Sequence, residues 1–325
     1  MSDCIEKIFQ KWLFSEKQHK SLEEIYLGIS QIDFSGLINA FVKRLSEINY
    51  SFTKSEQVSG AICFYGSVFV SLLNTGKIEQ IEHLFTFALC YMLVDHFLDD
   101  KNNTEKTKLE IMEELQKFIQ NGEVGENSLI QAAGKRYQEM INDIPEVKKE
   151  ILNLFDAEWK GHQISKSKSH SRDIYKEIAL KKGSGTARVI ACIIGLELEP
   201  NDHLGALIQL VDDCLDVSDD ADLNIFTLAR YDLEKTNWDN YILETCLEIE
   251  KLDKVYNFFK PILLTGLILG VHDNPNSVSE ELSALIQKYD FFNTTSKNYL
   301  NEWFYNKLYQ YIDDVKLNRK KIFHQ

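Results

Sequence analysis

The scarcity of proline constrains the fold of this chain more than any other feature. Only four prolines occur among 325 residues, and the first is Pro145. Proline removes a backbone donor and clashes with the preceding helical turn, so its absence permits long, uninterrupted helices. Apolar residues recur at helical spacing through nearly the whole chain, and alternating, strand-like patterns are rare. The sequence therefore predicts an all-α protein.

The length alone would suggest two domains. However, 44% of the residues are hydrophobic, which is ample for one large core near the upper size limit of a single domain. We therefore expect one α-helical domain spanning residues 1–325. The predicted helices include 56–74, 78–100, 173–197, 202–218 and 278–320, with polar loops at 165–172 and 219–227.

Charge and cysteine usage exclude several classes of protein. The net charge is −14 and no basic stripe occurs, so we expect no nucleic-acid partner. The six cysteines are scattered without a CxxC pair, which argues against a zinc or disulfide framework and favours a cytoplasmic location. No uninterrupted apolar stretch of 18 residues or more occurs, so no membrane span is expected. A homodimer is compatible with these features.

Two acidic clusters lie at the predicted C-terminal ends of apolar helices. Within each cluster, aspartates recur at i and i+4 and therefore share one helix face. Anions are unfavourable at this end of the helix dipole, so bound cations would offset the repulsion. Hard carboxylate oxygens beside an apolar surface indicate Mg²⁺ and a diphosphate substrate, whereas two solvated acidic patches are the simpler alternative. The candidate metal ligands are Asp95, Asp99, Asp100, Asp212, Asp216 and Asp220.

The two clusters resemble known motifs. Residues 95–100, DHFLDD, resemble the first aspartate-rich motif (DDxxD) of the class I isoprenoid synthase superfamily. Residues 209–216, QLVDDCLD, resemble the second motif (QxxDDxxD) of its trans-prenyl diphosphate synthases. The resemblance covers residues 56–320. It implies a class I terpenoid synthase-like helical bundle around a deep apolar cavity, three Mg²⁺ ions, and an allylic diphosphate that ionises to a carbocation.

Departures from the elongating enzymes favour a terpene synthase within this superfamily. The basic segment that precedes their first motif, the arginines that follow it and the basic segment after their second motif are all missing here. A second diphosphate would therefore lack partners, and burying unpaired phosphate charge is costly. The resemblance thus implies cyclisation or water quenching of a single substrate, farnesyl diphosphate, as in a sesquiterpene synthase. The alternatives are a trans-prenyl diphosphate synthase, a head-to-head coupling enzyme, or a non-catalytic regulatory subunit.

Several basic residues are candidates for the diphosphate site. Lys182 and Gly183 occupy the place of a lysine motif in elongating enzymes, and two glycines there predict a break or kink in the helix at 183–185. A surface lysine beside a packing glycine is the simpler interpretation. Arg188 could bind diphosphate or bridge helices, and Arg230 could cover the diphosphate. The same diphosphate role is assigned to Arg319 and Lys320, which also suit a helix C-terminus. Asp95, Lys182, Gly183 and Arg230 are the candidate catalytic residues.

Apolar and aromatic residues could line the cavity. The candidates are Phe64, Ala88, Tyr91 and Trp303, because a π-face can stabilise a carbocation as it does other cations. An ordinary core role is an equal alternative for each of them.

Overall fold

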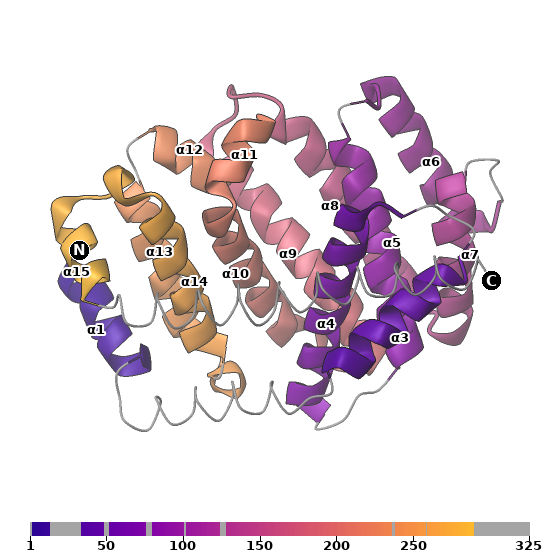
Figure 1. The fold of residues 1–325 in the computed structure, drawn as a ribbon, viewed down its shortest axis with the longest axis horizontal. Helices are drawn as coiled ribbons and strands as arrows, with labels where there is room; N and C mark the ends of the chain where they lie inside the picture. The colour runs from indigo at the N-terminus through magenta and orange to yellow at the C-terminus, as the bar shows by residue number, and fades with distance from the viewer. Residues whose placement is uncertain are drawn as a thin grey trace, which may run out of the picture. The chain divides into compact units, whose positions relative to one another are not determined.

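The computed structural model describes residues 2–13, 34–48, 52–75, 80–100, 102–123, 128–235, 238–257 and 259–288. Within these ranges the regular secondary structure is helical and includes no strand (Figure 1), which confirms the predicted all-α class. The α-helices are α1 (Ser2–Leu13), α3 (Phe34–Ser46), α4 (Lys54–Thr75), α5 (Ile81–Asp99), α6 (Glu105–Asn121), α7 (Ser128–Asp143), α8 (Val147–Ser165), α9 (Arg172–Ile194), α10 (Leu198–Leu215), α11 (Val217–Leu223), α12 (Leu228–Glu234), α13 (Trp238–Lys251), α14 (Phe259–Asp273) and α15 (Glu280–Gln287).

Local sequence signals set several helix ends. Thr53 and Glu56 form a capping box at the start of α4, because each backbone N–H donates to the other side chain, at 2.6 and 3.2 Å. The side chains of Thr104 and Ser279 cap α6 and α15. Gly122 ends α6 with a positive φ of 74°, a conformation that favours glycine.

The chain divides into two compact units, and α8 and α9 contribute residues to both. The unit that contains α3 to α7 is built around α5, which packs on α4 and α7. Eleven residues of α5 are buried. An aromatic group of Phe41, Phe64 and Phe85 joins α3, α4 and α5, with ring centroids 5.3 to 6.1 Å apart. The predicted single domain stays a prediction.

The other unit contains α1 and α10 to α15. Helices α13 and α14 pack on each other and on α1, and α15 packs on α1 and α14. Helix α14 is apolar nearly all round, as expected for an interior helix. Trp238 and Tyr241 stack on α13 with ring centroids 5.1 Å apart, and both are fully buried.

Helix α10 makes unusually close contacts with its neighbours. A Cβ built on Gly183 of α9 would lie 2.2 Å from the Gly205 backbone oxygen, and a Cβ on Gly205 would lie 2.3 Å from the Gly183 oxygen. On α14, a Cβ on Gly270 would lie 2.7 Å from the Cys214 backbone oxygen, and a Cβ on Gly266 would lie 2.4 Å from Val211 Cγ1. These glycines let backbones meet where any side chain would separate the helices.

Two predicted features of secondary structure were wrong. Helix α9 continues through Gly183–Gly185 without a break, and Gly183 instead lies at the close crossing with α10. The predicted loop 219–227 is mostly helix α11, which ends at Asn224 with a left-handed φ of 60°. Of the final predicted helix, 278–320, only α15 lies within the described residues.

Among the described residues, one helix, α5, is long and apolar enough to cross a membrane by length and composition alone. Most of it is buried against protein. The apolar composition of α5 is therefore also the composition expected of a core helix.

Candidate functional site

The second acidic cluster keeps a helical row of carboxylates across the junction of α10 and α11. Helix α10 ends at Leu215, and Asp216 separates it from α11. The row survives because the Asp216 N–H donates to the Asp212 carbonyl at 2.9 Å and the Asp220 N–H donates to the Asp216 carbonyl at 2.8 Å. Asp212 and Asp216 are exposed, and Asp220 is half-buried. The predicted spacing is thus realised in three dimensions.

The exposed carboxylates share a face of α10 with exposed apolar side chains. Ile208 is 42% exposed and Leu215 is 38% exposed. They lie four residues before and three residues after Asp212, so the three side chains are neighbours on one helix face. Large aliphatic side chains are mostly buried in folded proteins. This face therefore combines oxygen ligands with a surface suited to an apolar molecule.

Asp213 has a different environment from its neighbour Asp212. Asp213 is only 7% exposed, and Gln209 donates a hydrogen bond from Nε2 to Asp213 Oδ1 at 2.8 Å. Burial, opposed by the Gln209 hydrogen bond and aided by the nearby charge of Asp212, raises the pKa of Asp213 to about 8. Asp213 thus holds a proton at neutral pH and works as an internal hydrogen-bonding group.

Lys182 is the basic residue that the fold brings toward this cluster. Burial raises the pKa of both Asp212 and Asp213, and the positive charge of Lys182 acts against this rise. The neighbouring Gly183 fixes the approach of α9 to α10, since it meets Gly205 backbone to backbone. The diphosphate role of Lys182 stays a prediction, whereas Gly183 has the packing role that was its simpler interpretation.

The first cluster lies at the end of α5, in the other compact unit. Asp95 is half-buried, and Asp99 and Asp100 are exposed. Asp100 Oδ1 accepts from the backbone N–H and the side-chain Nδ2 of Asn102, at 2.8 and 2.9 Å, which is an Asx-type turn. Asp100 therefore shapes the turn after α5.

A lysine side chain lies at the C-terminal end of α5, where the helix dipole is negative. The buried Lys108 donates from Nζ to the Leu98 carbonyl. A cation at a helix C-terminus is favourable by typically 0.3–1 kcal/mol. Lys108 of α6 thus supplies part of the positive charge that the sequence analysis attributed to metal ions at the end of this helix.

Sequence reasoning missed a buried carboxylate near Asp95. Glu158 of α8 is 3% exposed and accepts a hydrogen bond from the Tyr91 hydroxyl at 3.1 Å. Tyr91 lies one turn before Asp95 on α5, and it is half-buried. The available signal was Glu158 itself, a charged residue four positions after the core residue Leu154. His96, the neighbour of Asp95, contacts Ser59 on α4 at 3.1 Å.

Two candidate arginines are engaged in contacts within the protein. Arg188 donates from Nε to Glu150 Oε2 at 2.7 Å and so bridges α9 and α8, which was the alternative to a diphosphate role. Arg230 is buried. It donates from Nη1 to the carbonyls of Asp220 and Ile225, at 3.1 and 2.8 Å, and its guanidinium lies 3.9 Å from the centre of the Phe226 ring. It holds α11 beside α12.

The remaining candidates are core residues or lie outside the described residues. Phe64 and Ala88 are packed inside the core of their unit. Trp303, Arg319 and Lys320 lie outside the described residues. In the part of the chain that the structure describes, no three His, Cys, Asp or Glu side chains gather closely enough to hold a metal ion.

Comparison with known proteins assigns no family. No protein-family model matches the chain, and neither the curated proteins nor the solved structures that we searched gave a match.

Proposed function

We propose that the protein is a Mg²⁺-dependent class I terpene synthase that acts on one allylic diphosphate, farnesyl diphosphate. The observation that carries the proposal is the face of α10 described above. Exposed Asp212 and Asp216 continue in helical register to Asp220, and exposed Ile208 and Leu215 flank Asp212. A diphosphate head with its metal ions would bind the carboxylates, and the prenyl chain would cover the aliphatic side chains.

The donor set fits Mg²⁺. Mg²⁺ prefers hard oxygen ligands and is usually bound by one or two carboxylates together with waters and substrate phosphates. Asp212, Asp216 and Asp220 offer such oxygens one helical turn apart, so each would share an ion with waters and phosphate oxygens, since the three do not gather around one ion position. The resemblance of DHFLDD implies Asp95 and Asp99 as further ligands. When bound, three Mg²⁺ ions would neutralise the diphosphate and make it a better leaving group.

Residues of the chain would then act on the substrate in distinct ways. Lys182, whose charge reaches Asp212, would attract the diphosphate as the bond between C1 and oxygen breaks and its electron pair leaves with the diphosphate. The aliphatic surface at Ile208 and Leu215 would exclude water from the allylic cation.

The test is incubation of the purified protein with farnesyl diphosphate and Mg²⁺, with and without isopentenyl diphosphate, followed by product analysis. The proposal predicts terpene hydrocarbons or alcohols in both mixtures. Longer prenyl diphosphates would indicate chain elongation. An unchanged substrate in both mixtures would contradict the proposal and favour a regulatory subunit.

A further inference from the structure

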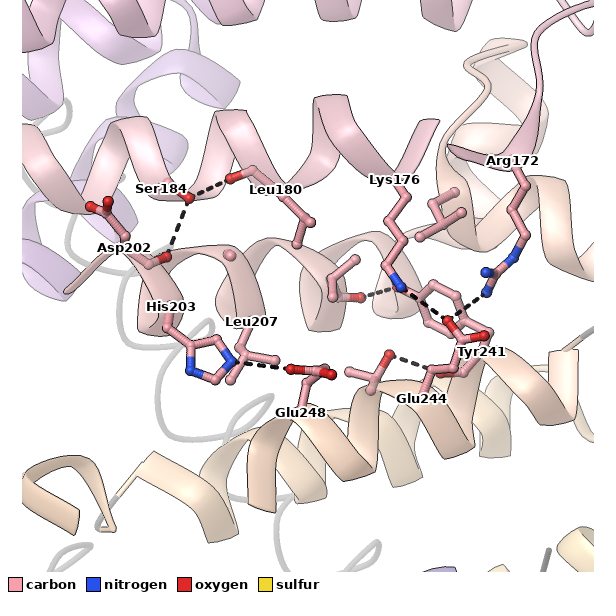
Figure 2. A pocket seen from close by; sticks show the side chains of 14 residues that line it. Arg172, Lys176, Leu180, Ser184, Asp202, His203, Leu207, Tyr241, Glu244 and Glu248 are labelled. Carbon is pink, nitrogen blue, oxygen red and sulfur yellow. Dashed lines mark hydrogen bonds and ion pairs between the residues drawn. The ribbon is translucent and has the colours of Figure 1, made fainter. Parts of the chain in front are cut away.

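A pocket lies inside the unit that contains α10 to α15, between α9, α10, α12 and α13 (Figure 2). Its volume is about 420 Å³, within the range of about 300–1,000 Å³ that is usual for small-molecule sites. The residues of α10 that line it include His203, Ala206 and Leu210. Given 3.6 residues per turn, these residues occupy the face opposite Ile208 and Asp212, so the pocket is separate from the proposed diphosphate site.

The floor of the pocket is apolar, and its side chains are already packed in place. Leu207, Leu210, Leu228 and Tyr241 line it, and all four are buried. The Tyr241 hydroxyl donates to the Leu210 carbonyl, and the Tyr241 ring stacks on Trp238 with ring centroids 5.1 Å apart. A ligand would therefore meet a surface that already has its shape, and little free energy would be spent on ordering that surface.

The hydroxyl groups that line the pocket donate their protons within the protein. Ser184 Oγ donates to the Leu180 carbonyl at 2.6 Å, and Thr245 Oγ1 donates to the Tyr241 carbonyl at 2.8 Å (Figure 2). The Tyr241 hydroxyl likewise donates to a backbone carbonyl. A ligand with many hydrogen-bond acceptors would find no hydroxyl proton here, whereas an apolar ligand needs none.

At one end of the pocket the positive charges are already matched (Figure 2). Arg172 donates from Nε to Asp232 at 2.8 Å and from Nη2 to Glu244 Oε2 at 3.0 Å. Lys176 donates to the same Glu244 oxygen at 3.2 Å. An anionic ligand would have to displace Glu244 to reach either cation.

At the other end the Glu248 carboxylate is matched as well. His203 Nε2 lies 3.6 Å from Glu248 Oε2, and Lys251 donates to Glu248 Oε1 at 2.7 Å. Figure 2 shows the Asp202 carboxylate pointing away from Glu248. A cationic ligand would have to compete with Lys251 for a half-exposed carboxylate, and ion pairs at such positions contribute little.

We propose that this pocket binds a small, neutral and largely apolar molecule, with its body over Leu207 and Leu210. A water molecule occupies about 30 Å³ of liquid, so the pocket suits a ligand of roughly a dozen non-hydrogen atoms. Such a ligand complements the apolar floor, whereas a charged head group would lose hydration without gaining an unmatched partner. The proposal does not depend on the proposed diphosphate chemistry.

Three probes that share one apolar body test the preference for a neutral ligand. These are 4-phenylbutan-1-ol, 4-phenylbutylamine and 4-phenylbutyrate, each titrated into the full-length protein by calorimetry at pH 7.5. We expect the alcohol to bind at least about fivefold more tightly than either charged probe, because it alone brings no uncompensated charge. A smaller preference, tighter binding of a charged probe, or no binding of the alcohol would overturn the proposal.

Two variants that fill the pocket locate the binding. Ala206→Leu adds side-chain atoms from α10, and Leu180→Trp adds them from α9, where Leu180 is only half-buried. Each should weaken the alcohol at least about tenfold, because the added atoms take the volume that the ligand needs, and melting temperatures show which variant keeps the fold. An unchanged alcohol affinity in a variant that keeps the fold would place the ligand elsewhere.

Glu244→Gln tests why the pocket prefers a neutral ligand. This change removes the carboxylate that Arg172 and Lys176 share, so the affinity for 4-phenylbutyrate should rise at least about fivefold while the affinity for the alcohol stays the same. The matched control is Glu199→Gln, because Glu199 is an exposed carboxylate on α10 outside the pocket lining, and it should change neither affinity. An affinity for 4-phenylbutyrate that does not rise in Glu244→Gln would refute the matched-charge argument.

Discussion

Gly183→Ala should destabilise the protein, although alanine is the better helix former. The added Cβ would lie 2.2 Å from the Gly205 oxygen and 2.7 Å from the Gln209 Cβ, whereas ordinary contacts begin near 3.4 Å. Because the nearest atom belongs to the backbone, α9 and α10 would have to separate by roughly 1 Å. Overpacking of this kind costs about 1–3 kcal/mol, and helix propensity returns only about 0.8–1.0 kcal/mol.

Gly66→Ala is the matched control, since a Cβ at Gly66 in α4 meets nothing within 4 Å. We expect Gly66→Ala to raise the free energy of unfolding by about 0.4–1 kcal/mol and Gly183→Ala to lower it by up to about 2 kcal/mol. At about 2–4 °C per kcal/mol for larger domains, thermal melts resolve the two. Equal stability of both variants would refute the close-crossing argument.

Further predictions concern three other parts of the chain. Arg44 hydrogen-bonds to Glu82 and thereby lowers the pKa of the Glu82 carboxyl. At neutral pH this ion pair stabilises the folded protein by at most about 1 kcal/mol. The contribution is lost as the pH falls through the folded pKa of Glu82, which lies below the ordinary value of about 4.3. The melting temperature of Glu82→Gln should therefore lie below that of the parent at pH 7 and converge with it once the pH is below the folded pKa of Glu82, and a constant difference would contradict this. Arg230→Met removes the guanidinium that donates to the carbonyls of Asp220 and Ile225. Amide hydrogen exchange in α11 should therefore accelerate at least about tenfold. Unchanged exchange would show that Arg230 does not stabilise α11. Labelled isopentenyl diphosphate should not enter any product, and its incorporation into a longer chain would support an elongating enzyme instead.

Most helices could be predicted from the sequence because their signals are local. The apolar periodicity predicted α4, α5 and α9 to within a few residues, and polar runs located the turns between them. The break at Gly183 was mispredicted because glycine propensity is a local property, whereas the residue's role depends on Gly205, which reaches it only through folding. Similarly, α11 is joined to the following helix by Arg230, which binds the Asp220 carbonyl, and only folding brings these groups together.

The chemistry of the candidate site was predicted unevenly for the same reason. The row formed by Asp212, Asp216 and Asp220 follows from spacing alone, and the backbone hydrogen bonds preserve it. Which of two adjacent aspartates is exposed depends on packing, so the sequence could not distinguish Asp212 from the buried Asp213. The contribution of Lys108 at the end of α5 also required the tertiary structure.

The most direct test of the proposed function compares these two adjacent aspartates. Diphosphate release from farnesyl diphosphate is measured with Mg²⁺ and with EDTA, for the parent protein, Asp212→Asn and Asp213→Asn. The account predicts release that requires Mg²⁺, falls at least about 100-fold in Asp212→Asn, and persists in Asp213→Asn, because asparagine mimics the protonated, buried carboxyl that Gln209 holds. Release that continues in EDTA, or that is equally retained in both variants, would contradict it.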